Sequence, residues 1–188
     1  CLTIMYNFTK FMEISDLRNF YNNWHTNFKV SREYDSKTAL FFQQLLARML
    51  EIRKPRKTNN LLDVACGNGY LLKEAEKYPF KTHGIDISDV AVKYAKNNTK
   101  AIVRRASAEG IPFKNNYFDY VTCIGSLEHF NDRNRALSEI SRVLKKNGVC
   151  MIHVPNLMFV GHIYMAARFG VMPSEGEQGF SEQYFTFK

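Results

Sequence analysis

Between residues 61 and 154 the chain alternates short apolar runs with segments of helical periodicity, and this alternation limits the possible fold more than any other feature. The apolar runs predict strands over 61–65, 81–85, 101–105, 117–124 and 149–154, and the periodic segments predict helices over 38–53, 70–77, 88–97 and 133–146. Strands that alternate with helices in this way pair in parallel. The sequence therefore predicts an α/β fold, a doubly wound parallel sheet with helices on its faces.

The chain of 188 residues is the size of one ordinary domain. Residues 1–57 are expected to form a helical arm and the first helix of the fold, 58–156 the core, and 157–188 a helical segment. Within that last segment, 157–172 is apolar but contains His162 and Arg168. It is too short and too polar for a membrane span, and none is expected.

Basic residues outnumber acidic ones, with 26 Lys and Arg against 18 Asp and Glu, a formal net charge of +8. Only 53–57 is a dense cluster, and it lies where a helix is predicted to end, which suits basic side chains. We therefore favour a solvated basic turn over a nucleic-acid surface, and nucleic acid is not expected as a partner.

The cysteines predict neither a metal site nor a disulfide framework. They form no C-x-x-C pair and have no histidine at metal-ligand spacing, so no bound metal is expected. Cys66, Cys123 and Cys150 lie in or beside apolar runs, the usual setting of buried, reduced thiols. The predicted location is the cytoplasm.

The segment Leu61-Leu-Asp-Val-Ala-Cys-Gly-Asn-Gly-Tyr70 carries the strongest chemical signal. A strand here runs into Gly67 and Gly69, which let the backbone approach a ligand at the start of a helix. Asp86 ends the next strand, where a carboxylate can accept hydrogen bonds from the hydroxyls of a ribose. Together these features predict a nucleotide-type cofactor site.

Two residues argue against NAD or FAD as that cofactor. A dinucleotide fingerprint needs a third small residue for close helix packing, whereas Leu72 stands there. Asp63 also lies inside the strand, four residues before Gly67. A nicotinamide oxidoreductase is therefore the disfavoured alternative.

Five stretches in sequence resemble the class I S-adenosylmethionine-dependent methyltransferases, in the group of the type 11 enzymes that methylate small molecules. They are Leu62-Asp-Val-Ala-Cys-Gly-Asn-Gly69, Gly84-Ile-Asp-Ile-Ser88, Ser107-Ala-Glu-Gly-Ile-Pro-Phe113 with Phe118-Asp119, Ser126-Leu-Glu-His-Phe130 and Arg142-Val-Leu-Lys-Lys-Asn-Gly148. The resemblance covers residues 35–155 and implies a Rossmann-like methyltransferase fold. It also implies S-adenosylmethionine as cofactor and S-adenosylhomocysteine as product.

The resemblance assigns roles along these stretches. It places Asp63, Gly67 and Gly69 beside the methionine part of the cofactor, Asp86 beside the ribose, Ser107 and Ala108 beside the adenine and Gly125 beside the methionine amino group. Cys66 and Ile87, inside the matched stretches, are included among the cofactor residues. Tyr21 resembles an aromatic residue that closes over the cofactor in relatives, although ordinary core packing explains it equally well.

The sequence departs from the family at two places. Ser107 stands where an Asp usually accepts from the adenine amino group, and a serine lacks the charge that strengthens such a bond. After the fifth strand the family continues through a helix and two more strands, and no convincing strand follows here before Lys188. Because the run 149–154 is apolar at nearly every position, we expect it to be buried on both faces. We therefore expect the natural protein to extend beyond Lys188, or another chain to cover this edge.

His129 and Glu128 are the candidate general bases, since they follow the carboxyl end of a strand, where ligands of parallel sheets bind. A purely structural role, capping or orienting the loop, is an equal alternative for His129 and is favoured for Glu128. The apolar segment 157–172 stands where the resemblance places an insertion that shapes the acceptor pocket, and it favours a small, partly apolar methyl acceptor. A plain packing helix explains this segment nearly as well. A cofactor-binding protein without catalysis and an RNA methyltransferase are the alternatives, and the sequence predicts neither the acceptor atom nor the oligomeric state.

Overall fold

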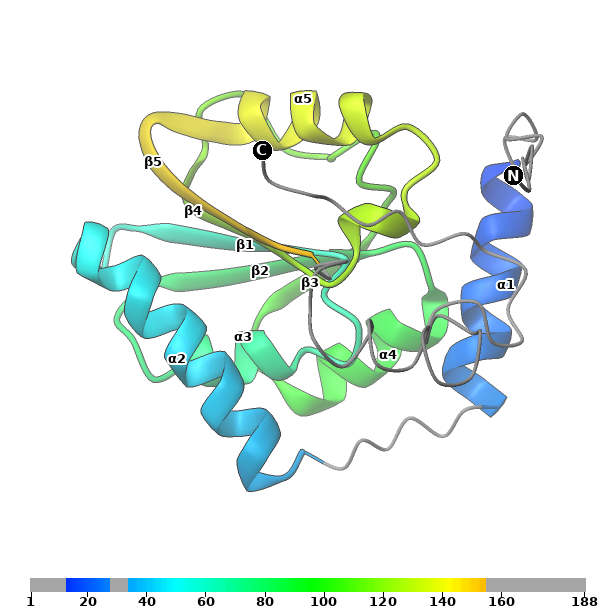
Figure 1. Cartoon of the computed structure of the whole chain (residues 1–188), viewed down its shortest axis with the longest axis horizontal. Coiled ribbons are helices and arrows are strands. Elements are labelled where there is room, and N and C mark those ends of the chain that lie inside the picture. Colours follow the sequence, from blue (N-terminus) through cyan, green and yellow to red (C-terminus); the bar gives the residue numbers. More distant parts are fainter. Residues whose placement is uncertain (1–12, 28–33, 155–188) are drawn as a thin grey trace, which may run out of the picture.

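The computed structural model describes residues 13–27 and 34–154, which form a five-stranded sheet with helices on both faces (Figure 1). Every pair of neighbouring strands is parallel, and the order across the sheet is β3-β2-β1-β4-β5. The strands are β1 (Asn60–Val64), β2 (Lys81–Asp86), β3 (Ile102–Arg105), β4 (Phe118–Ile124) and β5 (Leu144–His153). The predicted doubly wound α/β fold is confirmed.

The helices divide into two layers. Helices α2 (Ser36–Ile52), α3 (Tyr70–Ala75) and α4 (Asp89–Asn98) cover one face of the sheet, and α5 (Arg133–Val143) covers the other (Figure 1). Each layer buries its own apolar cluster, around Leu72 and Tyr120 on the first face and around Phe118 and Ile140 on the second. The helix α1 (Ile14–Asn27) lies outside both layers, at the carboxyl ends of the strands (Figure 1).

Local signals fix several of the helix boundaries. Ser88 and Asp132, both predicted as N-caps, accept from the backbone N–H groups of Ala91 and Arg135 at the starts of α4 and α5. On one side of β1 the sheet continues with β2 and β3, and on the other side it continues with β4 and β5. The strand order therefore reverses direction between β1 and β4. In open parallel sheets such a reversal leaves a crevice at the carboxyl ends of the strands, where ligands bind.

The predicted boundary between the last helix and the fifth strand is wrong. We expected the helix to continue to residue 146 and the strand to start at 149, whereas α5 ends at Val143 and β5 begins at Leu144. Leu144 pairs with Phe118, so the first residues of β5 extend the sheet beside β4. Pairing with a neighbouring strand therefore outweighs the helical preference of Leu144, Lys145 and Lys146.

The expected burial of the fifth strand on both faces is also wrong. Along β5 the residues are half-buried or exposed, with Ile152 38% exposed, and the thiol expected to be buried at Cys150 is exposed. Within the described residues, β5 pairs with β4 alone. Leu137, expected on the apolar face of α5, is 37% exposed. The segment 157–172 lies outside the described residues. The expectation that an extension of the chain or another chain covers the edge formed by β5 stays a prediction.

Within residues 13–27 and 34–154, no helix combines the length and apolar character needed to cross a bilayer.

Candidate cofactor and active site

A cavity of about 350 Å³ lies at the carboxyl ends of the strands, between the sheet and α1. Its wall combines loops that follow four strands with one face of α1. The lining residues are Leu17, Phe20, Tyr21 and His25 of α1, Ala65 and Gly67 after β1, Asp86 and Ile87 at the end of β2, Ala106, Ser107, Ala108 and Glu109 after β3, and Gly125, Ser126, His129 and Phe130 after β4. The structure thus brings together eight of the predicted site residues: Tyr21, Gly67, Asp86, Ile87, Ser107, Ala108, Gly125 and His129.

The loop after β1 turns through three residues with positive φ, Ala65 at 57°, Gly67 at 51° and Gly69 at 79°. Only glycine adopts such angles without strain, so Ala65 stores strain at the cavity wall. A Cβ added at Gly67 would meet no atom within 4 Å, and the same holds for Gly125. Both glycines therefore leave space for a ligand against the bare backbone.

Asp86 is held rigidly at the end of β2 and is 6% exposed. One carboxyl oxygen accepts the Gly67 N–H at 2.8 Å, and the other accepts the Ser88 N–H at 2.9 Å. Burial raises the pKa of Asp86, and these N–H groups and the neighbouring His25 oppose the rise. His25 shows the reverse effect: burial lowers its pKa and the Asp86 carboxyl group opposes the change.

Three predicted cofactor residues, Asp63, Cys66 and Gly69, do not line the cavity. Asp63 is buried in β1, where its carboxyl group accepts the Thr122 hydroxyl at 2.7 Å, and burial raises its pKa to about 7. Gly69 is the N-cap of α3, where an added Cβ would approach Ala95 to 3.1 Å.

Cys66 instead packs in the core beside β2. At Gly84, an added Cβ would lie 2.9 Å from the Cys66 sulfur and 2.7 Å from Cδ1 of Leu72. Gly84 therefore provides the room that the bulky Leu72 needs between α3 and the sheet, and burial raises the pKa of the Cys66 thiol well above its ordinary value.

The segment after β3 is fixed by hydrogen bonds to its own backbone and to α5. The Ser107 hydroxyl accepts the Glu109 N–H at 3.2 Å, and Ala108 is buried. The Glu109 carboxylate in turn accepts the Asp132 N–H at 2.9 Å. The Glu109 backbone carbonyl accepts from the Arg135 side chain at 2.8 Å. Glu109 thus lines the cavity and ties this segment to the start of α5.

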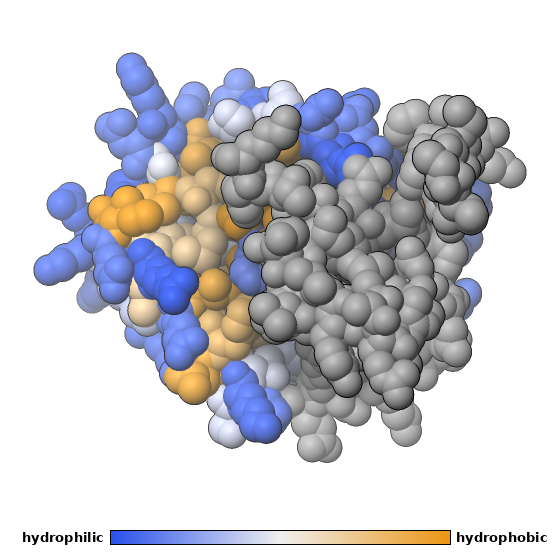
Figure 2. Space-filling view, viewed as in Figure 1, coloured by the Kyte–Doolittle hydropathy of each residue, from blue (hydrophilic) through white to orange (hydrophobic). Residues whose placement is uncertain are grey.

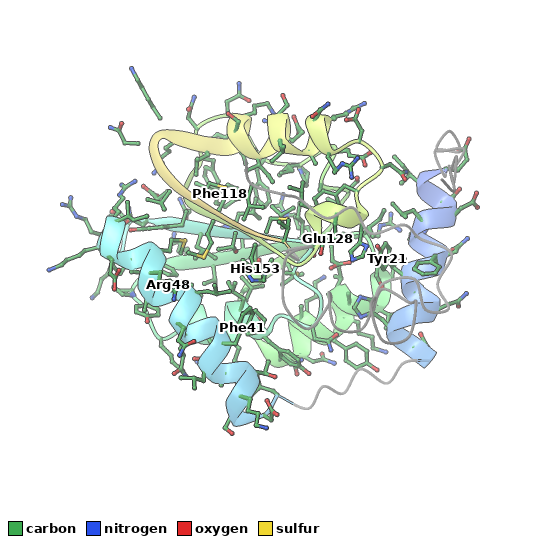
Figure 3. All side chains as sticks on the ribbon, in the orientation of Figure 1. Tyr21, Phe41, Arg48, Phe118, Glu128 and His153 are labelled. Carbon is green, nitrogen blue, oxygen red and sulfur yellow. The ribbon has the colours of Figure 1, made fainter. Side chains whose placement is uncertain are left out.

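The segment after β4 forms the other side of the cavity. His129, in the short helix η1 (Leu127–His129), has a side chain that is 25% exposed, with its Nε2 4.0 Å from Oε1 of the buried Glu128. Glu128 is absent from the cavity lining, so it can orient His129 from behind. Figure 3 shows Glu128 and Tyr21 at the same end of the sheet, with Tyr21 contributed by α1.

Helix α1 reaches the cavity because Asn22 attaches it to the start of α4. The Asn22 side-chain oxygen accepts the Ser88 hydroxyl at 2.8 Å and the Val90 N–H at 3.4 Å. Sequence reasoning missed Leu17, Phe20 and His25 here, and also Glu109, Ser126 and Phe130. Ser126, Phe130 and Glu109 lie inside the matched stretches, so position alone could have marked them, whereas in α1 the resemblance marked Tyr21 alone.

This arrangement can hold a nucleoside and an organic molecule side by side. Open glycines, the Asp86 carboxylate and the Ser107 segment supply polar groups to the cavity wall, and Leu17, Phe20 and Phe130 supply apolar ones. No group of three or more metal-ligating side chains occurs among the residues that the structure describes. Fold and site define a cofactor-binding protein of the doubly wound α/β class.

Comparison with known proteins identifies the family within this broad class of cofactor-binding α/β proteins. Residues 62–152 match the Methyltransf_11 family, described as a methyltransferase domain. The match begins in β1, ends in β5 and contains the loop after β1, Asp86 and the segments after β3 and β4. These residues are a class I S-adenosylmethionine-dependent methyltransferase domain, as the sequence motifs predicted.

The individual relatives are named for different activities. The chain is 35% identical to the uncharacterized protein MJ1252 of Methanocaldococcus jannaschii over 69% of the chain and 50% of the relative. It is 30% identical to the human mitochondrial arginine-hydroxylase NDUFAF5 over 92% of the chain and 49% of the relative. It is 28% identical to the ubiquinone biosynthesis O-methyltransferase of Pelagibacter ubique over 75% of the chain and 62% of the relative. The chain thus spans about half the length of the curated relatives it matches.

A solved structure supports the fold. The PH0226 protein of Pyrococcus horikoshii superposes with a TM-score of 0.63 at 24% identity, over 77% of this chain and 70% of that one. The likeness bears on the fold alone.

Proposed function

We propose that the protein transfers a methyl group from S-adenosylmethionine to a small, partly apolar molecule. The observation that carries this proposal is the cavity itself, whose wall combines the open glycines and Asp86 with His129 and apolar side chains. The ubiquinone O-methyltransferase among the relatives supports a small organic acceptor. The buried thiols of Cys66 and Cys123 favour a reducing compartment, for which we propose the cytoplasm.

The polar residues of the cavity wall fit the cofactor. Asp86 would accept from the ribose hydroxyls, since each carboxyl oxygen keeps a lone pair beyond its bond to a backbone N–H. Ser107 and Ala108 would lie against the adenine. Gly67 and Gly125 would lie against the methionine part, since the position that a Cβ would take at each glycine is open. The bound cofactor supplies a methyl group on a sulfonium, which is already activated for transfer.

The protein's own contribution is then chiefly to position the acceptor. Phe20, Tyr21 and Phe130 would enclose it and exclude water, and an aligned acceptor can lower the barrier by about 7 to 11 kcal/mol in well-oriented cases. His129 would take the proton from the acceptor, with Glu128 holding its ring in place.

Two measurements test the proposal. Calorimetry should show binding of S-adenosylhomocysteine and no competition by NADH, and incubation with S-adenosylmethionine and a panel of phenols, amines and quinols should yield a methylated product. Tight NADH binding without a response to S-adenosylhomocysteine would refute the cofactor assignment. Binding without transfer to any acceptor would favour the non-catalytic alternative that Ser107 suggests.

The similarity to NDUFAF5 favours hydroxylation as a second candidate function, because that relative matches nearly the whole chain. Mass spectrometry of the product separates the two reactions. Methylation adds a CH₂ unit that carries the isotope label of the cofactor methyl group. Hydroxylation, which needs an added oxidant such as O₂ with a reductant, adds one oxygen atom and no label.

His129→Ala is expected to lower turnover by about 10²- to 10⁴-fold, because a general base is removed. Cofactor affinity should stay nearly unchanged, since the proposal assigns His129, a lining residue, to the acceptor and not to the cofactor. Glu128→Gln should show a smaller loss of turnover, consistent with an orienting role. If S-adenosylhomocysteine affinity fell together with turnover in His129→Ala, His129 would be structural.

A further inference from the structure

The parallel sheet collects basic residues that are scattered along the sequence. All five strands run in one direction, so the residues that precede or open them meet at a single edge, here called the amino edge. Its described basic residues are Arg53, Lys54, Arg56 and Lys57 before β1, Lys77 and Lys81 at β2, Lys100 before β3, Lys114 before β4 and Lys145 and Lys146 in β5. The cluster at 53–57 is thus one part of a basic row that crosses the whole sheet.

Internal ion pairs neutralise little of this charge. Arg53 and Lys145 pair with Asp119 at 2.9 and 2.8 Å, and Lys77 pairs with the buried Glu74 at 2.6 Å. The other cations of the edge are exposed and make no ion pair with any described residue: Lys54, Arg56, Lys57, Lys81, Lys100, Lys114 and Lys146. Such a concentration of one charge attracts an anionic partner.

A cleft of about 590 Å³ deepens one end of the amino edge. Lys73, Lys77, Lys81 and Lys100 line it, together with Ile102 and one acidic residue, Glu76, whose carboxylate accepts the Lys100 N–H. Four lysines against one carboxylate leave the wall of the cleft with a net positive charge, and its volume is large enough for a phosphate-bearing headgroup. This cleft is separate from the cofactor cavity, with which it shares no lining residue.

Exposed aliphatic side chains accompany the charges. Ile52, at the end of α2 and two residues before Lys54, is 74% exposed, and Ile102, two residues after Lys100, is 51% exposed. In Figure 2, hydrophobic patches lie among hydrophilic residues at the left margin, where Figure 1 places the starts of β1 and β2. Lysines interspersed with protruding aliphatic groups suit the headgroups and the acyl boundary of an anionic bilayer.

The aromatic residues at this edge do not offer the stacking that single-stranded nucleic acid uses. Lys73 lies over the Tyr34 ring at 4.3 Å, with Tyr70 beside it. Phe80 packs against Tyr78 and Tyr120. Lys114 lies over the Tyr117 ring at 5.4 Å, and the Phe113 ring stacks with it at 6.0 Å. Since protein groups already contact these rings, a partner of the amino edge would bind through the charged and aliphatic side chains.

We propose that the amino edge binds the surface of an anionic membrane. The lysines contact the lipid phosphates and carboxylates, Ile52 and Ile102 enter the boundary with the acyl chains, and the cleft holds one headgroup. The cofactor cavity lies at the opposite end of the strands, so it stays open to water while the protein is bound.

Vesicle sedimentation tests this proposal without reference to catalysis. The full chain should sediment with vesicles of phosphatidylcholine mixed with phosphatidylserine and not with phosphatidylcholine alone. Raising NaCl from about 0.1 M to about 1 M should release it, because the screening length falls from about 10 Å to about 3 Å. The variant Lys54→Glu/Lys57→Glu should bind at least about tenfold more weakly, and Ile52→Ser should bind more weakly at unchanged charge.

Lys37→Glu/Lys93→Glu, which changes the charge equally on α2 and α4, is the matched control and should keep most of the binding. Circular dichroism verifies that each variant is folded. Equal binding to both kinds of vesicle, or an equal loss in the control pair, would contradict the proposal. Tighter binding of a single-stranded RNA oligonucleotide than of the mixed vesicles at the same salt would identify the edge as a nucleic-acid surface instead.

Discussion

Asp63 is a carboxyl group enclosed by the core, and its energetics can be separated from any role in binding. Burial raises its pKa to about 7 from an ordinary value of 3.8, against the opposing effect of the Thr122 hydroxyl, and the Asp86 charge adds to the rise. Between pH 4 and pH 7 the folded state therefore keeps a proton that the unfolded state has released. Stability falls as the pH rises through this window.

Asp63→Asn should remove this dependence, because an amide has no proton to lose and its oxygen can still accept from Thr122. We expect the variant to be more stable than the parent at pH 8, by on the order of 3 kcal/mol, and similar to it at pH 4. Urea unfolding at several pH values measures this. Asp89→Asn, which removes a half-exposed carboxylate, controls for the loss of one charge. Parallel profiles for the parent and Asp63→Asn would show that Asp63 ionises at an ordinary pH.

At the scale of elements, α5 acts as the support for the segment that lines the adenine side of the cavity. Arg142 pairs with both oxygens of Glu139, at 2.6 and 2.7 Å, and donates to the carbonyls of Ile111 and Phe113 at 2.8 Å. Glu139 also accepts the Ile111 N–H at 2.7 Å. One planar guanidinium thus fixes the chain just beyond Ser107 and Glu109.

Arg142→Lys should loosen that segment, because an ammonium group cannot reproduce the forked geometry. The expected result is about tenfold weaker S-adenosylhomocysteine binding by calorimetry, with a KM increase for the cofactor and little change in kcat. Arg133→Lys, at the other end of α5, is the matched control. A fall in kcat without any loss of affinity would contradict this positioning role.

The element scale also shows why the sequence predicted some features and not others. Strands β1, β2 and β4 and the caps at Ser88 and Asp132 follow from local patterns, because apolar runs and capping side chains act over a few residues. The start of β5 depends on Leu144 pairing with Phe118 from a distant strand, which no local pattern contains. The contribution of α1 to the cavity depends on Asn22 meeting Ser88, and a single asparagine in a helix gives no such signal.

At the scale of the whole molecule, the cavity joins parts of the chain that are far apart. Ligand contacts would link α1 to segments after β1, β2, β3 and β4. S-adenosylhomocysteine at about 100 times its Kd should therefore stabilise the folded state by about 2.7 kcal/mol, which corresponds to a rise in Tm of about 5 to 10 °C. Differential scanning calorimetry measures the rise.

Asp86→Ala should reduce this rise sharply at the same ligand concentration, because the ribose loses its acceptor. Asp89→Ala, three residues further on and half-exposed, should keep it. An undiminished rise in Asp86→Ala would place the ligand elsewhere.

The contact between Leu72 and Gly84 has a consequence for protein engineering. A designer who wished to convert the loop into one that accepts a dinucleotide would replace Leu72 with glycine, as the fingerprint demands. In this fold that single exchange would empty the volume that Gly84 leaves for the leucine and open a void between α3 and β2. A larger residue at position 84 alone would collide with the Leu72 side chain and the Cys66 sulfur. The two positions can therefore be redesigned only as a pair, and a change of cofactor has to start from α3 and β2 together.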